Sequence, residues 1–297
     1  MQNWAILITA HDDPEHLRMF IDIMSDDHVW FYIHVDMKSD LDRFSILQKM
    51  PRVCLIESRV NVHWGGWSQV QATLNLIEAA RKSPFEFKYF TFASGNHFPI
   101  QKPEKIWSHY IASGNEYINL VSVPNIALQK NMSRFKTFNV DGAYRPKGFA
   151  ARVKSPIYRL IARLPIRNIK KYLKGWTLYA GSNWWTLSDD AISCVEDTIK
   201  TRPELIEFFK YVKCPDESFF QTILGNSGFL GSCARADVYT DWSDPREAPA
   251  LIRMNHLPVI LAEGFTIEDG YGTGPAHFAR KFSTKNIEVV RSLQAVL

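Results

Sequence analysis

Several motifs that mark common ligand-binding proteins are missing from this sequence of 297 residues. No Gly-x-Gly-x-x-Gly follows the first apolar run, and no Gly-x-x-x-x-Gly-Lys-Ser/Thr loop occurs, which excludes the usual dinucleotide and phosphate-loop fingerprints. Neither a Gly-x-Ser-x-Gly elbow nor a His-Glu-x-x-His sequence is present. The sequence therefore gives no sign of a serine hydrolase or a zinc protease.

Cysteines and long apolar runs are also scarce. The four cysteines form no Cys-x-x-Cys pair and have no zinc-ligand spacing with histidine, which favours reduced thiols and a cytosolic protein. The first apolar run, residues 4–10, is too short for a secretory signal or a membrane span, and the other runs are also of strand length. We therefore expect a cytoplasmic protein that is not an integral membrane protein.

The first half of the sequence does contain a regular alternation of apolar runs and helical patterns. Strands are expected at residues 4–10, 30–35, 53–56, 87–92 and 116–121. Helices are expected at 14–24, 40–50, 67–81 and 104–113. Such alternation is typical of a mostly parallel sheet that helices cover on both faces, so the predicted fold class is α/β.

The remainder is less regular, and we expect one domain over residues 1–297. Residues 1–124 form its nucleotide-binding half, 125–175 an irregular and then basic helical insertion, and 176–297 the acceptor and catalytic half. Further strands are expected at 177–179 and 184–187, and further helices at 188–200 and 217–224. Residues 241–274, rich in Pro, Gly and charge, are expected to form a long structured loop that walls the substrate site.

One Asp-x-Asp sequence occurs, at Asp40-Leu41-Asp42. It follows a strand-end turn and precedes a helical pattern, so capping of that helix is the favoured interpretation. If it is a cap, no obvious clamp for a divalent metal remains, and we expect no metal site.

Seven short segments, taken in order, point to a family. They are residues 10–14 (AHDDP), 32–39 (YIHVDMKS), 64–72 (WGGWSQVQA), 94–100 (SGNHFPI), 181–187 (GSNWWTL), 214–220 (CPDESFF) and 278–282 (FARKF). With these segments the chain resembles the core-2/I-branching β-1,6-N-acetylglucosaminyltransferase family, which also includes peptide O-xylosyltransferases, and we expect a bacterial member. The resemblance covers nearly the whole chain. It implies a GT-A-type fold, a UDP-sugar donor, inversion at the anomeric carbon, and no metal or other cofactor.

The ends of the first two strands are the expected nucleotide site. In open α/β sheets ligands bind beyond the carboxyl ends of the strands, where Ala10 and His11 follow the first strand and Asp36 the second. The resemblance implies that Asp36, in a segment shared with Lys38, contacts the uracil or ribose. A carboxylate suits the uracil N3–H or a ribose hydroxyl. The alternatives are a turn aspartate that caps the next helix and a structural role for His11.

Residues 64–67 (WGGW) precede a helix whose first turn carries Ser68. Two glycines let the backbone approach a ligand closely, and free N–H groups at a helix start attract anions. A tight turn with a serine cap is an equally good interpretation. We expect a structural role with an indirect effect on the site.

Pro215-Asp216-Glu217 is the segment expected to carry catalysis. The resemblance implies that Glu217 is the general base that deprotonates the attacking hydroxyl. An inverting transfer is a single in-line displacement, so one carboxylate near the acceptor oxygen suffices. The alternative is that Asp216 and Glu217 only offset the dipole of a helix that begins here. For Asp216, placed among the residues around the sugars, a structural role is favoured.

Arg280 and Lys281, near the end of the chain, are expected to neutralise the departing diphosphate. Two cations can do this by charge-assisted hydrogen bonds where other enzymes of this fold use a metal, and the resemblance implies the lysine contact. The alternative is a solvated basic pair. An upstream arginine is also implied, and spacing does not choose between Arg246 and Arg253.

Three aromatic residues and a histidine are the candidates for sugar contacts. Trp184 and Trp185 are expected in a strand and so point to opposite faces, one into the core and the other toward an acceptor sugar. Tyr271, in a glycine-rich loop, is a further candidate for the acceptor wall. His97 stands where the family often has an acidic residue, which leaves the choice of donor sugar open.

Positive charge is concentrated in one segment. Residues 145–174 contain ten Lys or Arg and no Asp or Glu, and apolar residues alternate with the cations. A basic amphipathic segment is typical of peripheral contact with an anionic membrane, here at its inner face, where a lipid-linked glycan acceptor would lie. The alternative is a surface helix whose cations are solvated or line the phosphate site. Nucleic-acid binding is not expected, because no recognised fold motif accompanies the charge.

The predicted function is transfer of a sugar, N-acetylglucosamine by preference, from a UDP-sugar to a glycan hydroxyl, in β-1,6 linkage, during bacterial surface polysaccharide synthesis. The alternatives are a UDP-xylose-dependent xylosyltransferase and a non-catalytic protein that binds a sugar nucleotide or a glycan. Loss of turnover with retained UDP binding in a Glu217→Gln variant would separate the enzyme from the binder.

Overall fold

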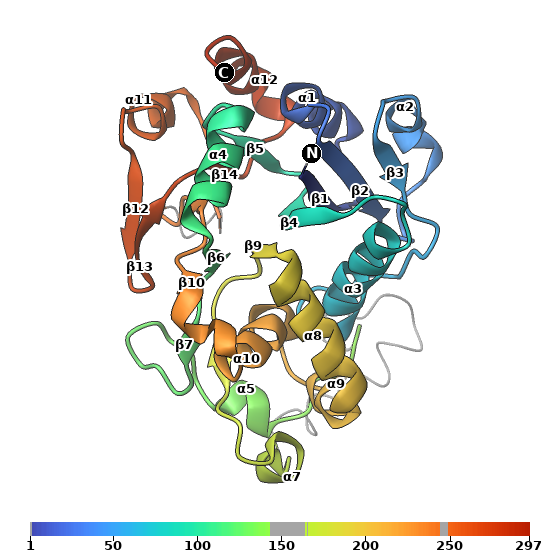
Figure 1. The fold of residues 1–297 in the computed structure, drawn as a ribbon, viewed down its shortest axis with the longest axis vertical. Helices are drawn as coiled ribbons and strands as arrows, with labels where there is room; N and C mark the ends of the chain where they lie inside the picture. Colours follow the sequence, from blue (N-terminus) through green and yellow to red (C-terminus); the bar gives the residue numbers. More distant parts are fainter. Residues whose placement is uncertain (1, 143–163, 165, 244–248) are drawn as a thin grey trace.

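The computed structural model describes residues 2–142, 164, 166–243 and 249–297, and Figure 1 shows the course of the chain. Most of the basic segment 145–174 therefore lies outside the described residues. None of the described helices is long and apolar enough to cross a membrane.

Four parallel strands form one side of the central sheet. β1 (Asn3–Ala10) lies between β2 (Val29–Val35) and β4 (Phe87–Ser94), and β3 (Val53–Leu55) pairs with β2. β1 and β2 are buried along almost their whole length, as parallel strands covered on both faces require. The carboxyl ends of β1, β2 and β4 therefore meet at one edge of the sheet, where a ligand is expected.

Short strands from distant parts of the chain form the other side of the sheet. β9 (Trp185–Ser188) lies antiparallel between β4 and β6 (Glu116–Ile118), and β10 (Cys233–Ala234) pairs in parallel with β6. The seven strands are ordered β10-β6-β9-β4-β1-β2-β3. The mixed, mostly parallel sheet expected from the sequence is confirmed.

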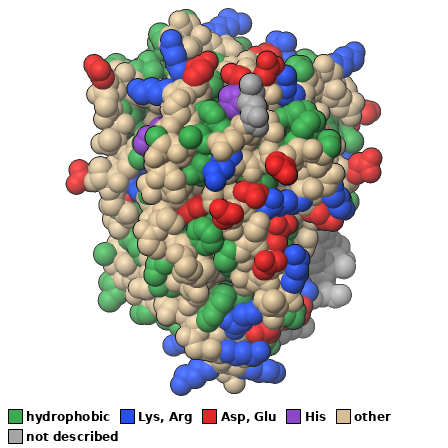
Figure 2. Space-filling view, viewed as in Figure 1, with side chains coloured by type: hydrophobic (Ala, Val, Ile, Leu, Met, Phe, Trp, Pro, Cys, Tyr) green, Lys and Arg blue, Asp and Glu red, His purple; other side chains and the backbone are tan. Residues whose placement is uncertain are grey.

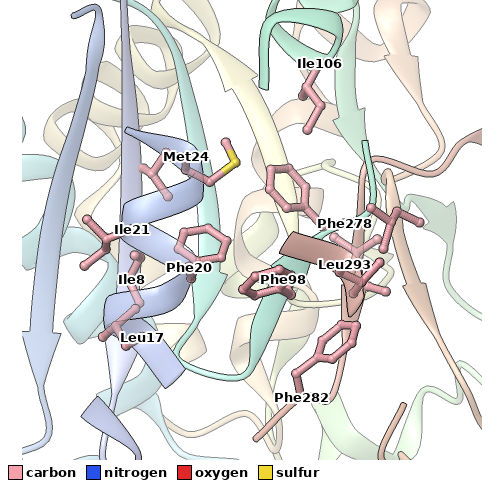
Figure 3. Close-up of a cluster of buried hydrophobic side chains, with 14 of the residues drawn as sticks. Ile8, Leu17, Phe20, Ile21, Met24, Phe98, Ile106, Phe278, Phe282 and Leu293 are labelled. Carbon is pink, nitrogen blue, oxygen red and sulfur yellow. The ribbon is translucent and has the colours of Figure 1, made fainter. Parts of the chain in front are cut away.

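Helices cover both faces of this sheet (Figure 1). The helices on one face are α3 (Trp67–Arg81), α8 (Asp189–Thr201), α9 (Pro203–Phe209) and α10 (Phe219–Gly225). Those on the other face are α1 (Pro14–Met24), α4 (Pro103–Ser113) and α12 (Ile287–Gln294). Because residues of β1 point alternately to the two sides, Leu7 joins the first core and Ile8 the second. In Figure 3, Phe20 of α1 lies beside Phe98 and Phe278, which come from distant segments.

A second, three-stranded sheet carries part of the predicted site. Its central strand, β14 (Phe278–Arg280), is parallel to β11 (Val238–Thr240) and antiparallel to β5 (His97–Pro99). A separate hairpin is formed by β12 (Thr266–Asp269) and β13 (Gly272–Pro275).

The other described elements are short. They are α2 (Ser45–Gln48), α5 (Ser133–Lys136), α7 (Ile169–Leu173), α11 (Leu257–Ile260), β7 (Val121–Ser122) and β8 (Tyr179–Ala180). Single 3-10 turns are η1 (Asp42–Phe44), η2 (Pro215–Glu217), η3 (Gly228–Ser232), η4 (Met254–His256) and η5 (Thr284–Asn286). The expected helix 40–50 is thus only η1 followed by α2.

Two further expectations were wrong. Residues 241–274, expected as one loop, contain α11, β12 and most of β13; only Ile267 is buried in β12, so the alternation that marks a strand is absent there. The expected strand 116–121 is divided into β6 and β7. Between them the buried side chain of Asn119 accepts a hydrogen bond from the Ala236 N–H (2.9 Å), which ties this segment to a distant one.

Candidate functional site

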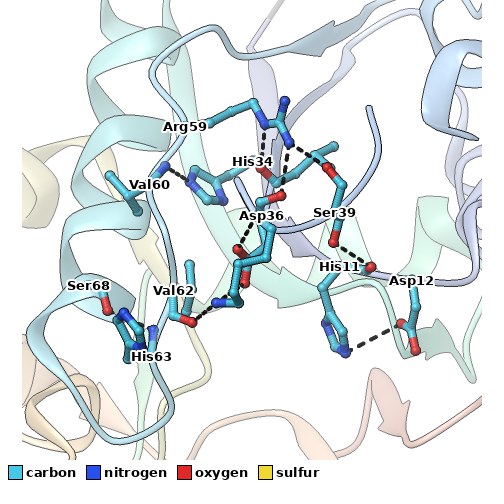
Figure 4. A network of polar contacts seen from close by, with 12 residues as sticks. His11, Asp12, His34, Asp36, Ser39, Arg59, Val60, Val62, His63 and Ser68 are labelled. Carbon is cyan, nitrogen blue, oxygen red and sulfur yellow. Dashed lines mark hydrogen bonds and ion pairs between the residues drawn. The ribbon is translucent and has the colours of Figure 1, made fainter. Parts of the chain in front are cut away.

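The ends of β1 and β2 are joined by hydrogen bonds (Figure 4). The N–H of Asp36 donates to the carbonyl oxygen of Ala10 (2.8 Å). The Asp36 carboxylate accepts from the Lys38 N–H (2.9 Å) and pairs with Lys38 Nζ (2.9 Å), which also contacts the Val62 carbonyl. Because Asp36 is only 7% exposed, a ligand here would meet the carboxylate and the ammonium as a pair.

Arg59 holds the loop that follows β2. Its guanidinium donates to the carbonyl oxygens of Val35 (2.9 Å), Asp36 (2.9 Å) and Ser39 (2.8 Å). One side chain thereby fixes the backbone on both sides of the expected nucleotide contact. No sequence motif points to Arg59, because its partners are backbone atoms.

Of the two expected contacts at the end of β1, only His11 offers an accessible side chain. Its ring is 66% exposed, and its carbonyl oxygen accepts from the Ser39 hydroxyl (2.7 Å). Ala10 is buried, and a Cβ placed on Gly95 would lie 3.3 Å from the Ala10 Cβ. The turn after β4 therefore packs closely against the end of β1.

Glu217 is the centre of a second group. Its carboxylate is 33% exposed, and Oε2 pairs with both Lys130 Nζ (3.1 Å) and Arg134 Nη1 (3.0 Å). Lys130 follows β7 and Arg134 lies on α5, and no motif in the sequence points to either. Among the described residues none donates to Oε1, so this oxygen is left to accept a proton from a ligand.

The turn that presents Glu217 is held by backbone contacts. Its carbonyl oxygen accepts from the Gly181 N–H (2.8 Å), and the Cys214 N–H donates to Gly65 O (2.9 Å). A Cβ on Gly181 would lie 1.6 Å from a backbone oxygen, so only glycine allows this approach. The helix expected to begin at Glu217 in fact begins at Phe219, because η2 and the non-helical Ser218 come first.

Gln69 of α3 links the WGGW turn to the catalytic segment. Its Oε1 accepts from the Gly65 N–H, and its Nε2 donates to Asp216 Oδ2 (3.1 Å). Burial and, after it, the charge of Glu217 raise the pKa of Asp216 to about 7. Asp216 is therefore buried next to Glu217 and has a structural role, rather than lining the surface of the site.

The N-terminus of α3 contacts a carboxylate of the same chain, that of Asp141. Asp141 Oδ2 accepts from the Ser68 N–H (2.9 Å), and a Cβ on Gly66 would lie 1.8 Å from Asp141 Oδ1. Asp141 thus takes the place that a bound anion could occupy. The WGGW turn has the structural role expected of it.

Tyr271 lies at the turn of the β12–β13 hairpin. The buried Arg235 pairs with the Asp269 carboxylate through Nε (3.2 Å) and Nη2 (2.5 Å), and Asp269 Oδ1 accepts from the Tyr271 N–H (2.9 Å). Burial and then the charge of Glu217 raise the pKa of the Tyr271 phenol. Arg235, which no motif indicated, therefore anchors the hairpin that brings Tyr271 toward the base.

Arg280, Trp184 and His97 form a third group. The register of β14 and β5 places Arg280 opposite His97, and Arg280 Cζ lies 4.5 Å from the centre of the Trp184 ring. Burial lowers the pKa of Arg280 to about 10, and its Nε has no hydrogen-bond partner among the described residues. A buried guanidinium with an unused donor suits a phosphate oxygen.

His97 lies behind Trp184 rather than at the surface. It is 1% exposed, its Nδ1 accepts from the Ser94 N–H (3.0 Å), and its ring centre is 4.5 Å from that of Trp184. Burial and next the charge of Arg280 hold its pKa well below the usual range. His97 therefore supports Trp184, contrary to the expected sugar contact. Trp185 is also 1% exposed, so it is the core member of the tryptophan pair.

The other expected diphosphate contacts are Lys281, Arg253 and Arg246. Lys281 is partly buried, and its backbone pairs with that of Ala250 and Ile252. Arg253 is exposed at the start of η4, and Arg246 lies outside the described residues. The upstream arginine at the diphosphate stays a prediction.

Two segments join the three groups. The loop whose Val62 carbonyl contacts Lys38 continues to Gly65, which receives the Cys214 N–H. The turn from Gly181, which contacts Glu217, continues to Trp184. Chain continuity therefore links the three groups to one another.

The described residues contain no group of three or more His, Cys, Asp or Glu side chains that could hold a metal ion. In the Asp-x-Asp sequence, Asp40 Oδ1 accepts from the Asp42 N–H (3.1 Å). This bond is an Asx turn that precedes η1, whose N-cap residue is Leu41 and has no side-chain cap bond, so the expected capping role of Asp40 is not seen.

The profile of the Core-2/I-Branching enzyme family matches residues 5–266. The chain belongs to the core-2/I-branching enzyme family. This core-2/I-branching enzyme is 25% identical over 282 residues to a xylosyltransferase of Ciona intestinalis, covering 90% of the chain and 30% of that protein. It is 27% identical over 237 residues to the β-1,3-galactosyl-O-glycosyl-glycoprotein β-1,6-N-acetylglucosaminyltransferase 3 of Rattus norvegicus, covering 77% and 48%.

A solved structure also aligns with this core-2/I-branching enzyme. The galactosyltransferase LgtC, in complex with donor and acceptor sugar analogs, aligns over 98% of the chain and 96% of its own length, with 9% identity and a TM-score of 0.38. The GT-A-type α/β class rests on the family and on the sheet described above. The chain spans about a third to a half of the length of the two curated relatives.

Proposed function

We propose that this chain is an inverting glycosyltransferase that moves a sugar from a UDP-sugar to a glycan hydroxyl without a metal ion. The proposal rests on the contacts and the exposure of the Glu217 carboxylate. This carboxylate is partly exposed, two cations hold one oxygen, and the other oxygen is left for the acceptor. A carboxylate that is held in this way through Oε2 would accept the proton at its other oxygen, Oε1.

The proposed reaction is a single displacement. The acceptor oxygen forms a bond to the anomeric carbon while the bond from that carbon to the UDP oxygen breaks, and UDP leaves with the electron pair. The proton of the acceptor hydroxyl passes to Glu217 Oε1. Attack opposite the leaving group inverts the anomeric carbon.

Charge on the departing UDP needs a cationic partner. Arg280 offers a buried guanidinium with an unused Nε donor, and Lys281 adjoins it in sequence. A charge that is held in a buried site stabilises a developing anion without reorganisation of water. The Asp36–Lys38 pair and the exposed His11 would receive the nucleoside at the other end of the site.

The donor sugar, the linkage and the acceptor form the second part of the proposal. We propose N-acetylglucosamine as donor sugar, β-1,6 linkage and a bacterial surface glycan as acceptor, made at the cytoplasmic face of the membrane. UDP-xylose is the second candidate, because one similar protein is a xylosyltransferase. Trp184 and Tyr271 are the aromatic side chains that would contact the sugars.

The test is UDP release from a panel of UDP-sugars, measured with EDTA, for the wild type and Glu217→Gln. We expect Glu217→Gln to lower kcat by about 10²- to 10⁴-fold, the usual contribution of a general base, while calorimetry shows UDP binding retained. The matched control is Glu263→Gln, since Glu263 is exposed and contacts none of the three groups of the site in the described residues. UDP binding without turnover in all three proteins would support a non-catalytic binder, and equal, measurable turnover would contradict Glu217 as the base. A requirement for Mn²⁺ would contradict the metal-free reaction.

A further inference from the structure

A basic and apolar surface lies at one end of the molecule. It is formed by Lys136, Leu164, Ile166, Lys170 and Lys171 and is called the basic face here. All five residues are exposed, and the two apolar side chains are 43% (Leu164) and 62% (Ile166) exposed. Figure 2 shows Lys and Arg side chains gathered at the lower end of the molecule, where α7 lies in Figure 1. The basic face thus combines two exposed aliphatic side chains with three cations.

The basic face is fixed to the rest of the fold. The Arg167 N–H donates to Lys136 O (3.2 Å), which joins the end of α5 to the segment before α7. The Arg167 guanidinium is buried and donates to the carbonyl oxygens of Phe135 and Tyr211, both at 3.3 Å. Arg167 is therefore an anchor and not one of the solvated cations expected in this segment.

Positive charge on the basic face is not neutralised by neighbouring acids. Lys136, Lys170 and Lys171 have no ion pair within the part of the chain that the structure describes. The acids on α9 are taken by other lysines: Glu204 pairs with Lys174 (2.9 Å), and Glu207 pairs with Lys210 (2.6 Å). Three uncompensated lysines beside two exposed apolar residues are thus left to a partner.

We propose that the basic face binds the surface of an anionic lipid bilayer. Leu164 and Ile166 enter the boundary between head groups and acyl chains, and the lysines contact lipid phosphates. A soluble polyanion would match the lysines but would offer no apolar phase for the two aliphatic side chains. The combination of residues therefore favours a bilayer.

The position of the basic face relates it to the catalytic group. Helix α5 carries Arg134, which pairs with Glu217, and two residues later Lys136, which lies on the basic face. Because residues two apart on a helix point to nearly opposite sides, a bilayer bound through Lys136 would lie across α5 from Glu217. Delivery of a lipid-linked acceptor from this bilayer rests on the proposed function, whereas binding to vesicles does not.

The experiment is co-sedimentation of the full chain with phosphatidylcholine vesicles that either lack or contain phosphatidylglycerol. We expect binding only to the anionic vesicles. The triple variant Lys136→Gln/Lys170→Gln/Lys171→Gln should bind about 100-fold more weakly, since each lysine near an anionic leaflet contributes about fivefold. The matched control, Lys49→Gln/Lys102→Gln/Lys105→Gln, removes the same charge from exposed lysines elsewhere and should bind as the wild type does.

Ile166→Ser separates a bilayer from a soluble polyanion. It should weaken vesicle binding and leave binding to dextran sulfate unchanged. The proposal is overturned if the wild type does not bind anionic vesicles, if the triple variant and its control bind equally, or if Ile166→Ser has no effect. Transfer of sugar to a soluble acceptor should be the same in all these proteins. A failure of the proposed membrane binding can therefore be distinguished from a failure of the proposed transferase activity.

Discussion

Asp216→Asn should change the pH dependence of stability in a direction that the structure fixes. Asp216 is 7% exposed, its Oδ1 has no hydrogen-bond partner among the described residues, and burial together with Glu217 raises its pKa from 3.8 to about 7. A carboxyl group whose pKa is higher in the folded state adds stability at low pH, and this stability is lost as pH rises through the folded pKa. About three pKa units correspond to ~4 kcal/mol of unfolding free energy.

The wild type should therefore lose up to about 4 kcal/mol between pH ~4 and ~7, and Asp216→Asn should not. The amide oxygen can still accept from Gln69 Nε2, so the variant keeps the contact seen in the fold. Urea unfolding followed by tryptophan fluorescence across this pH range gives the difference in unfolding free energy. Asp22→Asn, at an exposed position of α1, is the control. A difference between wild type and Asp216→Asn that stays constant with pH would refute the reasoning.

Two further changes test the supports of the site. Lys130→Met should lower kcat at least about tenfold with little change in the Kd for UDP, because one charge-assisted hydrogen bond to Glu217 is lost; an unchanged kcat would show that this pair is incidental. Gly66→Ala should lower the unfolding free energy by about 1 kcal/mol, because its methyl group displaces the Asp141 cap. Gly228→Ala, which meets nothing within 4 Å, should be nearly neutral in the same urea titration, and equal losses in the two variants would argue against the clash.

The elements that the sequence predicts well are those with long local patterns. The helices 14–24 and 67–81 have the expected bounds, because their apolar spacing repeats over three or more turns. The central strands were also expected, since buried parallel strands are continuous apolar runs. The three-stranded sheet was not predicted. Its strands have three residues each and are defined by partners far away in the sequence, which no local pattern records.

Motifs point to candidate site residues but not to the partners of those residues. Asp36 and Glu217 stand in segments that identify the family, and their roles stay predictions. Their partners Arg59, Lys130 and Arg134 were not found, because each acts across a long sequence separation through one side chain. Burial of His97 was also not predictable, since a histidine next to an apolar strand can face either way.

The position of β9 has a consequence for how the chain is made. Strands β4 and β6 do not pair with each other, because residues 185–188 lie between them. On the ribosome, both of these strand edges stay unpaired until more than half of the protein has emerged. The first part of the chain therefore cannot complete its sheet alone, and refolding from urea should be slow, as expected when contacts join residues far apart in the sequence.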